Sequence, residues 1–162
     1  MSEPLLRVEG LTRHFRVGKL FSHQKLHAVD DVSFELEPGE IVALVGESGS
    51  GKSTIARLLA RVYRPTAGEI YFDGKPVSSL RSRQRRLAYA SDVAMVFQDP
   101  YSSINPAKRL GYVLSRPLVN YQGLKGEELR ERVKELLERV ALTPADRFIN
   151  RYGYELSGGQ RQ

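Results

Sequence analysis

The sequence predicts an α/β fold with strands in its N-terminal part and an α-helical region in its last third. Three observations carry this prediction. Two early segments are rich in Val, Phe and Leu with partial alternation, which is typical of strands. The run IVALVG at 41–46 is followed at once by glycines and a helical pattern, and residues 126–142 repeat apolar side chains at helical spacing. With 162 residues, of which 41% are hydrophobic, the chain is long enough to build a core.

The elements up to residue 99 follow from local patterns. Residues 41–46 are predicted to form a strand buried on both faces, because a short continuous apolar run is typical of a parallel sheet. The segment 18–26 between the first two strands is predicted to be a loop. The predicted elements are strands at 5–17, 27–40 and 41–46, a helix at 53–63, a strand at 69–74 that ends in a turn, and a buried strand at 94–99.

The region beyond Pro100 is predicted to be mainly helical. Its clearest element is residues 126–142, in which apolar side chains share one face. Glu128 to Arg132 and Glu135 to Arg139 stand four apart in the order that favours ion pairs on a helix surface. The apolar face consists of Leu129, Val133, Leu136, Leu137 and Val140.

Composition excludes several classes of site. Without cysteines the chain has neither disulfides nor thiolate metal sites, and its histidines do not form a ligand cluster at any familiar spacing. Any metal is therefore expected to use oxygen ligands. The histidines are His14, His23 and His27.

Charge and hydropathy suggest a cytoplasmic location. The apolar runs are too short to span a bilayer, and the N-terminus lacks a basic region followed by an apolar stretch. The net charge is +6, carried partly by RSRQRR at 81–86. We interpret this run as a solvated surface, since no aromatic residues interleave with it; the alternative is contact with nucleic acid or an anionic membrane.

The stretch GESGSGKST at 46–54 predicts nucleotide binding. It fits the pattern G-x-x-x-x-G-K-[ST] with Gly46, Gly51, Lys52 and Ser53 in the fixed places. Glycines let backbone N–H groups surround phosphate oxygens, Lys52 would reach the β and γ phosphates, and Ser53 would ligate Mg²⁺. The alternative is a Gly/Ser-rich turn with an accidental lysine. The expected contacts are Gly46, Glu47, Ser48, Gly49, Ser50, Gly51, Lys52, Ser53 and Thr54.

Two further stretches make the chain resemble the ATP-binding subunits of ABC transporters. VFQDP places Gln98 after a predicted strand, and LSGGQ at 156–160 matches the signature of that family. The resemblance implies a P-loop NTPase core with an antiparallel β-subdomain over 1–98 and an inserted helical subdomain over 99–162. It also implies ATP and Mg²⁺ as ligands, with hydrolysis coupled to transport.

The resemblance assigns roles to single residues. Gln98 is expected to touch Mg²⁺ and the attacking water, so Lys52 and Gln98 are the catalytic candidates and Ser53 and Gln98 the metal ligands. Phe15 matches the aromatic residue that stacks on adenine, although a strand aromatic buried in the core is an alternative. The signature residues are expected to bind the nucleotide held by a partner subunit; these are Ser157, Gly158, Gly159 and Gln160.

Some family elements do not occur in the sequence. The acidic strand and the switch histidine that follow the signature are absent, so we interpret the chain as a truncated part of a longer subunit. Because phosphoryl transfer relies on positioned water and charge stabilisation, this chain is expected to bind MgATP better than it hydrolyses it. The missing core strands should also leave sheet edges open and apolar surface exposed.

The segment FQDPYSSINP at 97–106 resembles the dipeptide and oligopeptide import ATPases. One departure lies before the signature, where Gly153 and Tyr154 stand in place of Pro and His. This resemblance implies a second ATP-binding subunit arranged head to tail, transmembrane permease subunits docking near 100–115 and 150–155, and indirectly an extracytoplasmic substrate-binding protein. It places the chain peripherally on the inner face of the cell membrane, with no nucleic acid partner.

Two other functions stay open at this point. One is a non-transport ABC-type ATPase acting on DNA, in which residues 81–86 would contact phosphates; such proteins usually carry long coiled-coil or zinc-bearing insertions that this chain lacks. The other is a nucleotide-binding or interaction module without turnover.

Overall fold

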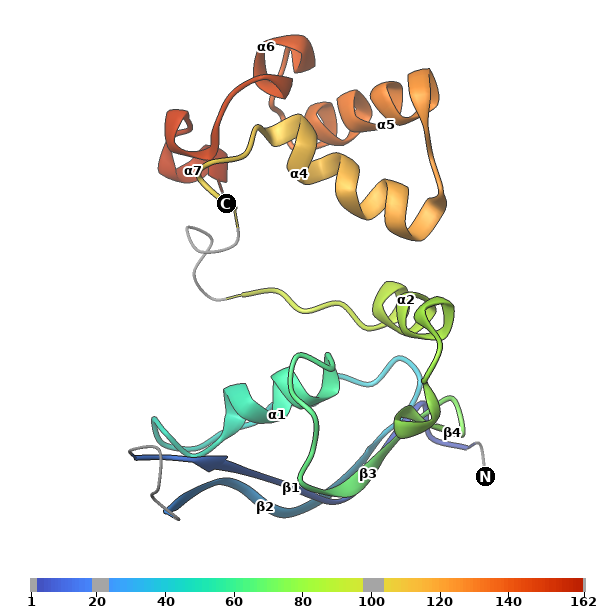
Figure 1. Cartoon of the computed structure of the whole chain (residues 1–162), viewed down its shortest axis with the longest axis vertical. Coiled ribbons are helices and arrows are strands. Elements are labelled where there is room, and N and C mark those ends of the chain that lie inside the picture. Colours follow the sequence, from blue (N-terminus) through green and yellow to red (C-terminus); the bar gives the residue numbers. More distant parts are fainter. Residues whose placement is uncertain (1–2, 19–23, 98–103, 162) are drawn as a thin grey trace. The chain divides into compact units, whose positions relative to one another are not determined.

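The computed structural model describes residues 3–18, 24–97 and 104–161 (Figure 1). The chain divides into two compact units, Met1–Met95 and Val96–Gln162. The domain boundary predicted at 98/99 lies outside the described residues. Each unit has its own apolar core and is described by itself.

The first unit contains an antiparallel sheet with the strand order β2-β1-β3-β4. Alternation in β1 buries Leu6 and Val8, and a register shift after Val8 returns Leu11 to the core, where it is fully buried. The strands predicted near 5–17, 27–40 and 69–74 are therefore confirmed. Their bounds are β1 (Leu6–Arg16), β2 (Lys25–Leu36), β3 (Ala67–Phe72) and β4 (Lys75–Pro76).

Helix α1 (Lys52–Leu59) covers one face of this sheet (Figure 1). Its buried side chains Ile55 and Leu58 pack with Leu11, Val29 and Ile70 of the strands. The predicted helix at 53–63 is confirmed, but it ends earlier, at Leu59. This packing holds α1 against the sheet. Because α1 begins directly after the glycine-rich loop, the end of that loop is held in place as well.

Helix α2 (Arg83–Asp92) follows a 3₁₀ turn (Val77–Ser79) and begins with the basic run. Ser82 caps it, since its hydroxyl accepts a hydrogen bond from the Arg85 N–H at 3.2 Å. Residues 81–86 are all exposed, as expected for a solvated basic surface. Tyr89 is buried, and its hydroxyl donates to the Leu59 carbonyl at 2.5 Å, which fastens α2 to the end of α1.

Two predicted strands are wrong. Residues 41–46 and the described part of 94–99 are not in strands, and most of their apolar side chains are exposed, with Ile41 96% and Val96 94% accessible. A strand buried on both faces needs a neighbour on each edge, and no described strand pairs with either segment. The exposed apolar surface expected from the sequence is thereby confirmed.

The second unit is helical, as predicted for the region beyond Pro100. Its core joins Leu110, Leu118, Val133, Leu137 and Phe148 from successive helices. The helices are α4 (Leu110–Pro117), a π-helical segment (Leu118–Gln122), α5 (Gly126–Arg139), α6 (Ala145–Ile149), a 3₁₀ turn (Gly153–Glu155) and α7 (Gly158–Arg161).

Helix α5 confirms the predicted amphipathic helix but differs in detail. It ends at Arg139, so Val140 lies beyond the last turn and is exposed instead of sharing the apolar face. The ion pair of Arg132 is also different, because its guanidinium lies 2.5 Å from Glu135, three residues on, and not against Glu128. Lys134 pairs with Asp146 of α6 and with Glu131, and these two carboxylates raise the pKa of Lys134.

Within residues 3–18, 24–97 and 104–161, no helix is both long and apolar enough to span a bilayer.

Candidate nucleotide-binding site

The phosphate loop, residues 46–54, turns into α1 at Gly51. This residue caps the helix with a φ of 93°, a left-handed conformation that side chains rarely adopt. A Cβ here would also lie 2.3 Å from the Ala28 carbonyl oxygen of β2. The Gly51 carbonyl accepts the first helical hydrogen bonds, from the N–H groups of Thr54 and Ile55 at 2.8 and 2.9 Å. Only glycine fits this position.

The Lys52 ammonium lies over the loop. Its Nζ donates to the carbonyl oxygens of Gly46 at 2.8 Å and Glu47 at 2.6 Å, and lies 3.2 Å from the Ser50 hydroxyl. All three partners are neutral, so the positive charge is oriented without being neutralised. The lysine therefore marks the place where an anionic group would be bound.

The N-terminus of α1 completes an anion site. The N–H groups of the first turn have no partner within the helix, and the positive end of the helix dipole lies at the same terminus. No acidic side chain in the first turn neutralises this positive potential. Residues 46–50 and Ser53 are exposed, so a ligand can reach both the backbone and the Ser53 hydroxyl. Phosphate oxygens fit this donor set, and an oxygen-seeking cation such as Mg²⁺ fits the hydroxyl.

Phe15 lies near the end of β1 and is half-buried. Its ring meets Tyr63 edge to face, with centroids 5.2 Å apart, and the Arg13 guanidinium lies 4.5 Å from its centroid. Arg13 is held there by a hydrogen bond from Nη1 to the Arg64 carbonyl at 2.8 Å. Phe15 is not among the fully buried core residues, and its ring remains partly accessible for stacking.

The signature stretch 156–160 begins α7. Leu156 is buried, whereas Ser157, Gly158, Gly159 and Gln160 are exposed. Ser157 and Gln160 satisfy each other: the Ser157 N–H donates to Gln160 Oε1 at 3.0 Å, and the Ser157 hydroxyl accepts from the Gln160 N–H at 3.3 Å. A Cβ on Gly159 would meet no described atom within 4 Å, so packing inside this chain does not require a glycine there.

The predicted site residues are distributed over both units. Residues 46–54 and Phe15 belong to the first unit, and Ser157 to Gln160 belong to the second. Gln98 lies outside the described residues, and so does Asp99, the neighbouring carboxylate.

Comparison with known proteins identifies the family. Residues 29–162 match the family described as ABC transporter, which is most of the chain. The chain belongs to the ABC transporter family. This confirms the family resemblance and the P-loop fold class predicted from the phosphate loop and the signature.

Curated relatives of this ABC chain are peptide transport proteins by name. It is 44% identical over 162 residues to the di/tripeptide transport ATP-binding protein DppF of Pseudomonas aeruginosa, covering 99% of this chain and 49% of the relative. It is 40% identical over 163 residues to the oligopeptide transport ATP-binding protein AppF of Bacillus subtilis, covering 99% and 49%. The chain thus spans about half the length of the curated relatives it matches.

Solved structures of ABC cassettes share the fold. A dimeric ATP-binding cassette in a post-hydrolysis state, bound to ADP and Pi, superposes with a TM-score of 0.76 at 29% identity, covering 96% of this chain and 65% of that one. A cassette from the cbiONQ transporter complex of Clostridium perfringens gives a TM-score of 0.66 at 26% identity, covering 99% and 59%.

The departure before the ABC signature has a structural explanation. Gly153 is buried, and a Cβ there would lie 2.8 Å from the Ile104 side chain. Tyr154 is exposed and stacks on Tyr152, with ring centroids 5.4 Å apart. The Tyr152 N–H donates to the Glu155 carboxylate at 2.6 Å, which fixes the turn. A small residue and a surface aromatic are therefore suited to these two positions.

A hollow of about 460 Å³ elsewhere in the first unit contains none of the predicted site residues. It is lined by the end of α1, by β3 and by the turn before α2, and includes Arg61, Arg64, Arg81 and Arg86. The residues predicted to bind nucleotide lie instead on an exposed loop. Their hydrogen-bonding groups, and not a cavity, therefore indicate the ABC nucleotide site.

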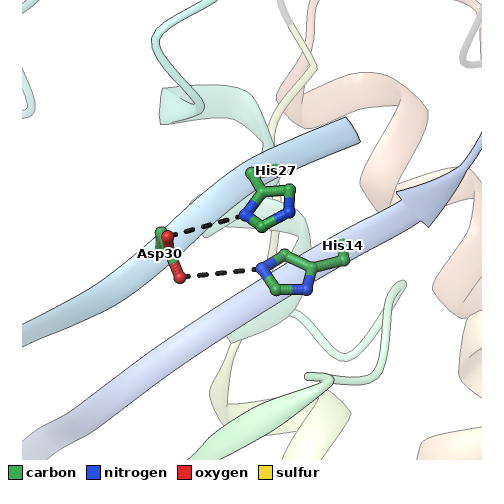
Figure 2. Close-up of side chains that lie close together, drawn as sticks. All are labelled: His14, His27 and Asp30. Carbon is green, nitrogen blue, oxygen red and sulfur yellow. Dashed lines mark ion pairs between the residues drawn. The ribbon is translucent and has the colours of Figure 1, made fainter. Parts of the chain in front are cut away.

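Sequence reasoning missed one group of residues. The histidines have no familiar ligand spacing in the sequence, but His14 and His27 lie together with Asp30 where β1 and β2 pair (Figure 2). The available signal was that both histidines lie in strands joined by one short connection, so a hairpin could place them opposite each other.

Proposed function

We propose that this chain is the ATP-binding part of an ABC import ATPase, in which it binds MgATP on residues 46–54. The observation that carries the proposal is the position of Lys52. Its Nζ is held by neutral oxygens of the loop, at the point where Gly51 begins α1. A phosphate chain offers stronger, charged acceptors for the same ammonium and for the free N–H groups beside it.

Four of the predicted residues then have defined tasks. Lys52 would move its hydrogen bonds from Gly46 and Glu47 to the β and γ phosphates. Ser53, exposed in the first turn of α1, and Gln98 would hold Mg²⁺, which neutralises phosphate charge during transfer. Phe15 would stack on adenine with the ring face that Arg13 leaves accessible. None of these residues supplies a carboxylate base, so we expect slow phosphate release from this chain alone.

The signature residues are proposed to serve a second ATP-binding subunit, arranged head to tail. Support comes from Gly159, which is exposed and is not required by packing within the chain. Ser157 already uses its hydroxyl to cap α7, so that hydroxyl and the N–H groups of the first turn share one orientation. Two solved structures of a similar cassette are dimeric.

The proposed transport system takes up dipeptides or oligopeptides, as the names of the relatives state for those proteins. The transmembrane permease subunits would dock near 100–115 and 150–155, and among the described residues there Tyr112 and Tyr154 expose large aromatic surfaces. Such docking would hold the chain on the inner face of the cell membrane, and an extracytoplasmic substrate-binding protein would act only through the permease. We expect no nucleic acid partner, since no observation favours DNA contact by residues 81–86.

The test compares two proteins. One is the 162-residue chain, and the other is a chimaera in which the C-terminal half of the Pseudomonas aeruginosa relative follows Gln162. We expect both to bind MgATP and only the chimaera to release phosphate at an appreciable rate. Failure of the short, folded chain to bind MgATP would contradict the proposal, and rapid release by it would mean that a carboxylate within this chain, Asp99 first, acts as the base.

A further inference from the structure

Two histidines and one carboxylate form a cluster on the pair of strands β1 and β2. His14 and His27 are register partners, with ring centroids 3.9 Å apart. Both rings present a nitrogen to Asp30: His14 Nε2 lies 3.6 Å from Asp30 Oδ1, and His27 Nδ1 lies 3.6 Å from Asp30 Oδ2 (Figure 2). Three atoms that can ligate a metal thus converge within 4.8 Å of one another.

These distances fit a shared cation better than direct hydrogen bonds. A nitrogen and an oxygen 3.6 Å apart are too far for a hydrogen bond, which needs about 2.7–3.2 Å. Ligands bound tetrahedrally at about 2.0–2.1 Å from a metal lie about 3.4 Å from one another. The two nitrogen to oxygen distances, one to each oxygen of Asp30, are close to that value, and one ligand atom from each of the three residues lies within 4.8 Å of the others.

An irregularity of the backbone creates the cluster. His27 and Asp30 are three apart, so a regular strand would place their side chains on opposite faces. Arg13 pairs with Val29 and His14 with His27, so β2 carries one extra residue, Ala28, between consecutive pairs. A second shift follows, because Leu11 pairs with Val32. Such bulges redirect side chains, and here they bring Asp30 to the two rings.

The cluster also leaves a polar atom unsatisfied. His14 Nε2 is shielded from solvent and has no hydrogen-bond partner among the described residues. A buried nitrogen without a partner costs free energy that a bound ion would recover. The side chains of His27 and Asp30 are 56% and 66% exposed, so an ion can enter and water can complete its coordination.

We propose that His14, His27 and Asp30 bind one divalent transition metal ion, with Zn²⁺ the best match. Imidazole ligands favour such ions over Mg²⁺ and Ca²⁺, and two imidazoles with one carboxylate and a water form a tetrahedral set. The ion would join β1 to β2 one residue from Phe15. This site is distinct from the phosphate loop and does not rest on the proposed function.

The experiment titrates Zn²⁺ into the nucleotide-free 162-residue chain in competition with a chromophoric chelator. We expect one ion per chain, and at least tenfold weaker binding for His27→Gln and for Asp30→Asn, both at exposed positions. Co²⁺ in place of Zn²⁺ should give the intense visible absorption of a tetrahedral site. Circular dichroism establishes that each variant is folded, and Zn²⁺ should raise the thermal midpoint of the parent chain but not of these variants.

Two matched variants serve as controls. His23→Gln removes the remaining histidine, and Asp31→Asn removes a carboxylate next to Asp30 at a positive φ of 49° that asparagine tolerates. Both should bind Zn²⁺ as the parent does. No binding to the folded parent, an octahedral Co²⁺ spectrum, or an equal loss in the controls would overturn the proposal.

Discussion

The phosphate loop and the signature stretch are both rich in glycine and serine and both begin a helix, yet their own chain holds them in different ways. In the phosphate loop, Gly51 is packed against the Ala28 carbonyl, and Lys52 is bound to three oxygens of the loop. In the signature, Gly159 has open space around its Cα and the side chains cap only their own short helix.

This difference in the steric need for glycine indicates whether each loop binds within its own chain or contacts another molecule. A glycine enforced by backbone conformation and close packing belongs to a shape the chain makes for itself. A glycine at which a side chain would clash with nothing in its own chain indicates contact with another molecule. A larger residue at that position would interfere only with that molecule. This contrast supports the proposal that the first loop binds in its own subunit and the second in a partner.

The largest effect on stability is expected for Gly51→Ala, which tests the contrast between the two loops. We expect the free energy of unfolding to fall by about 2–5 kcal/mol, the sum of left-handed strain and the clash with Ala28. Gly49→Ala is the matched control, because its φ is 87° but a Cβ there meets nothing within 4 Å, so it should cost only about 1–2 kcal/mol. Chemical denaturation measures both. Equal losses would mean that the contact with Ala28 is unimportant.

The next test is Lys52→Ala. Loss of charge-assisted hydrogen bonds to phosphate should weaken MgATP binding by about 1.5–3 kcal/mol, or roughly 10- to 150-fold. A fluorescent ATP analogue measures the affinity. Lys75→Ala, which removes an exposed lysine that pairs with Asp73 at 3.7 Å, should leave this affinity unchanged. Unaltered affinity in Lys52→Ala would refute the central assignment.

A smaller effect is expected at the far end of α1, the helix that carries the phosphate loop. Burial raises the pKa of Tyr89 to about 12, and its hydroxyl donates to Leu59. Tyr89→Phe should cost about 1 kcal/mol at neutral pH. Because the folded pKa exceeds the ordinary value of 10, this residue's contribution is complete below pH 10 and is lost as the pH rises toward 12.

The measurement for Tyr89 is the free energy of unfolding against pH. The parent chain should lose stability between pH 10 and 12, and Tyr89→Phe should lose less over the same range. Tyr121→Phe, at an exposed tyrosine, is the control and should follow the parent. Identical slopes for the parent and Tyr89→Phe would show that the burial of this hydroxyl does not couple to folding.

The smallest effect on the isolated chain is expected for Gly159→Ala. Since a Cβ meets nothing and the residue lies in α7, the unfolding free energy should stay the same or rise by up to about 1 kcal/mol. ATP-dependent dimerisation of the chimaera, measured by light scattering, should weaken. A stability loss as large as that of Gly51→Ala would contradict the contrast between the two loops.

Local sequence patterns predicted much of the fold. The strands β1, β2 and β3 and the helix α5 follow from alternation and helical spacing, which each segment carries within itself. The segments 41–46 and 94–99 were predicted from apolar character alone. Pairing is a property of two segments, and no described strand pairs with 41–46 or with 94–97, so the two predictions are wrong over these described residues.

The sites show the same division. The phosphate loop could be predicted because its residues are consecutive and their spacing is fixed by one ligand. The cluster of His14, His27 and Asp30 could not, because it depends on an extra residue at Ala28 in the register of two strands. The ion pair of Arg132 with Glu135 was missed for a simpler reason, since one helix face offers neighbours at both three and four residues.

The contact between Gly51 and the Ala28 carbonyl limits how this protein could be re-engineered. Ala28 is the extra residue at the register shift of β2, so the phosphate loop packs against a β-bulge of the neighbouring strand pair. Transplanting residues 46–54 alone into another scaffold would therefore leave out the β2 backbone against which the loop packs. A working graft would have to carry residues 27–29 with the loop, as a two-part cassette.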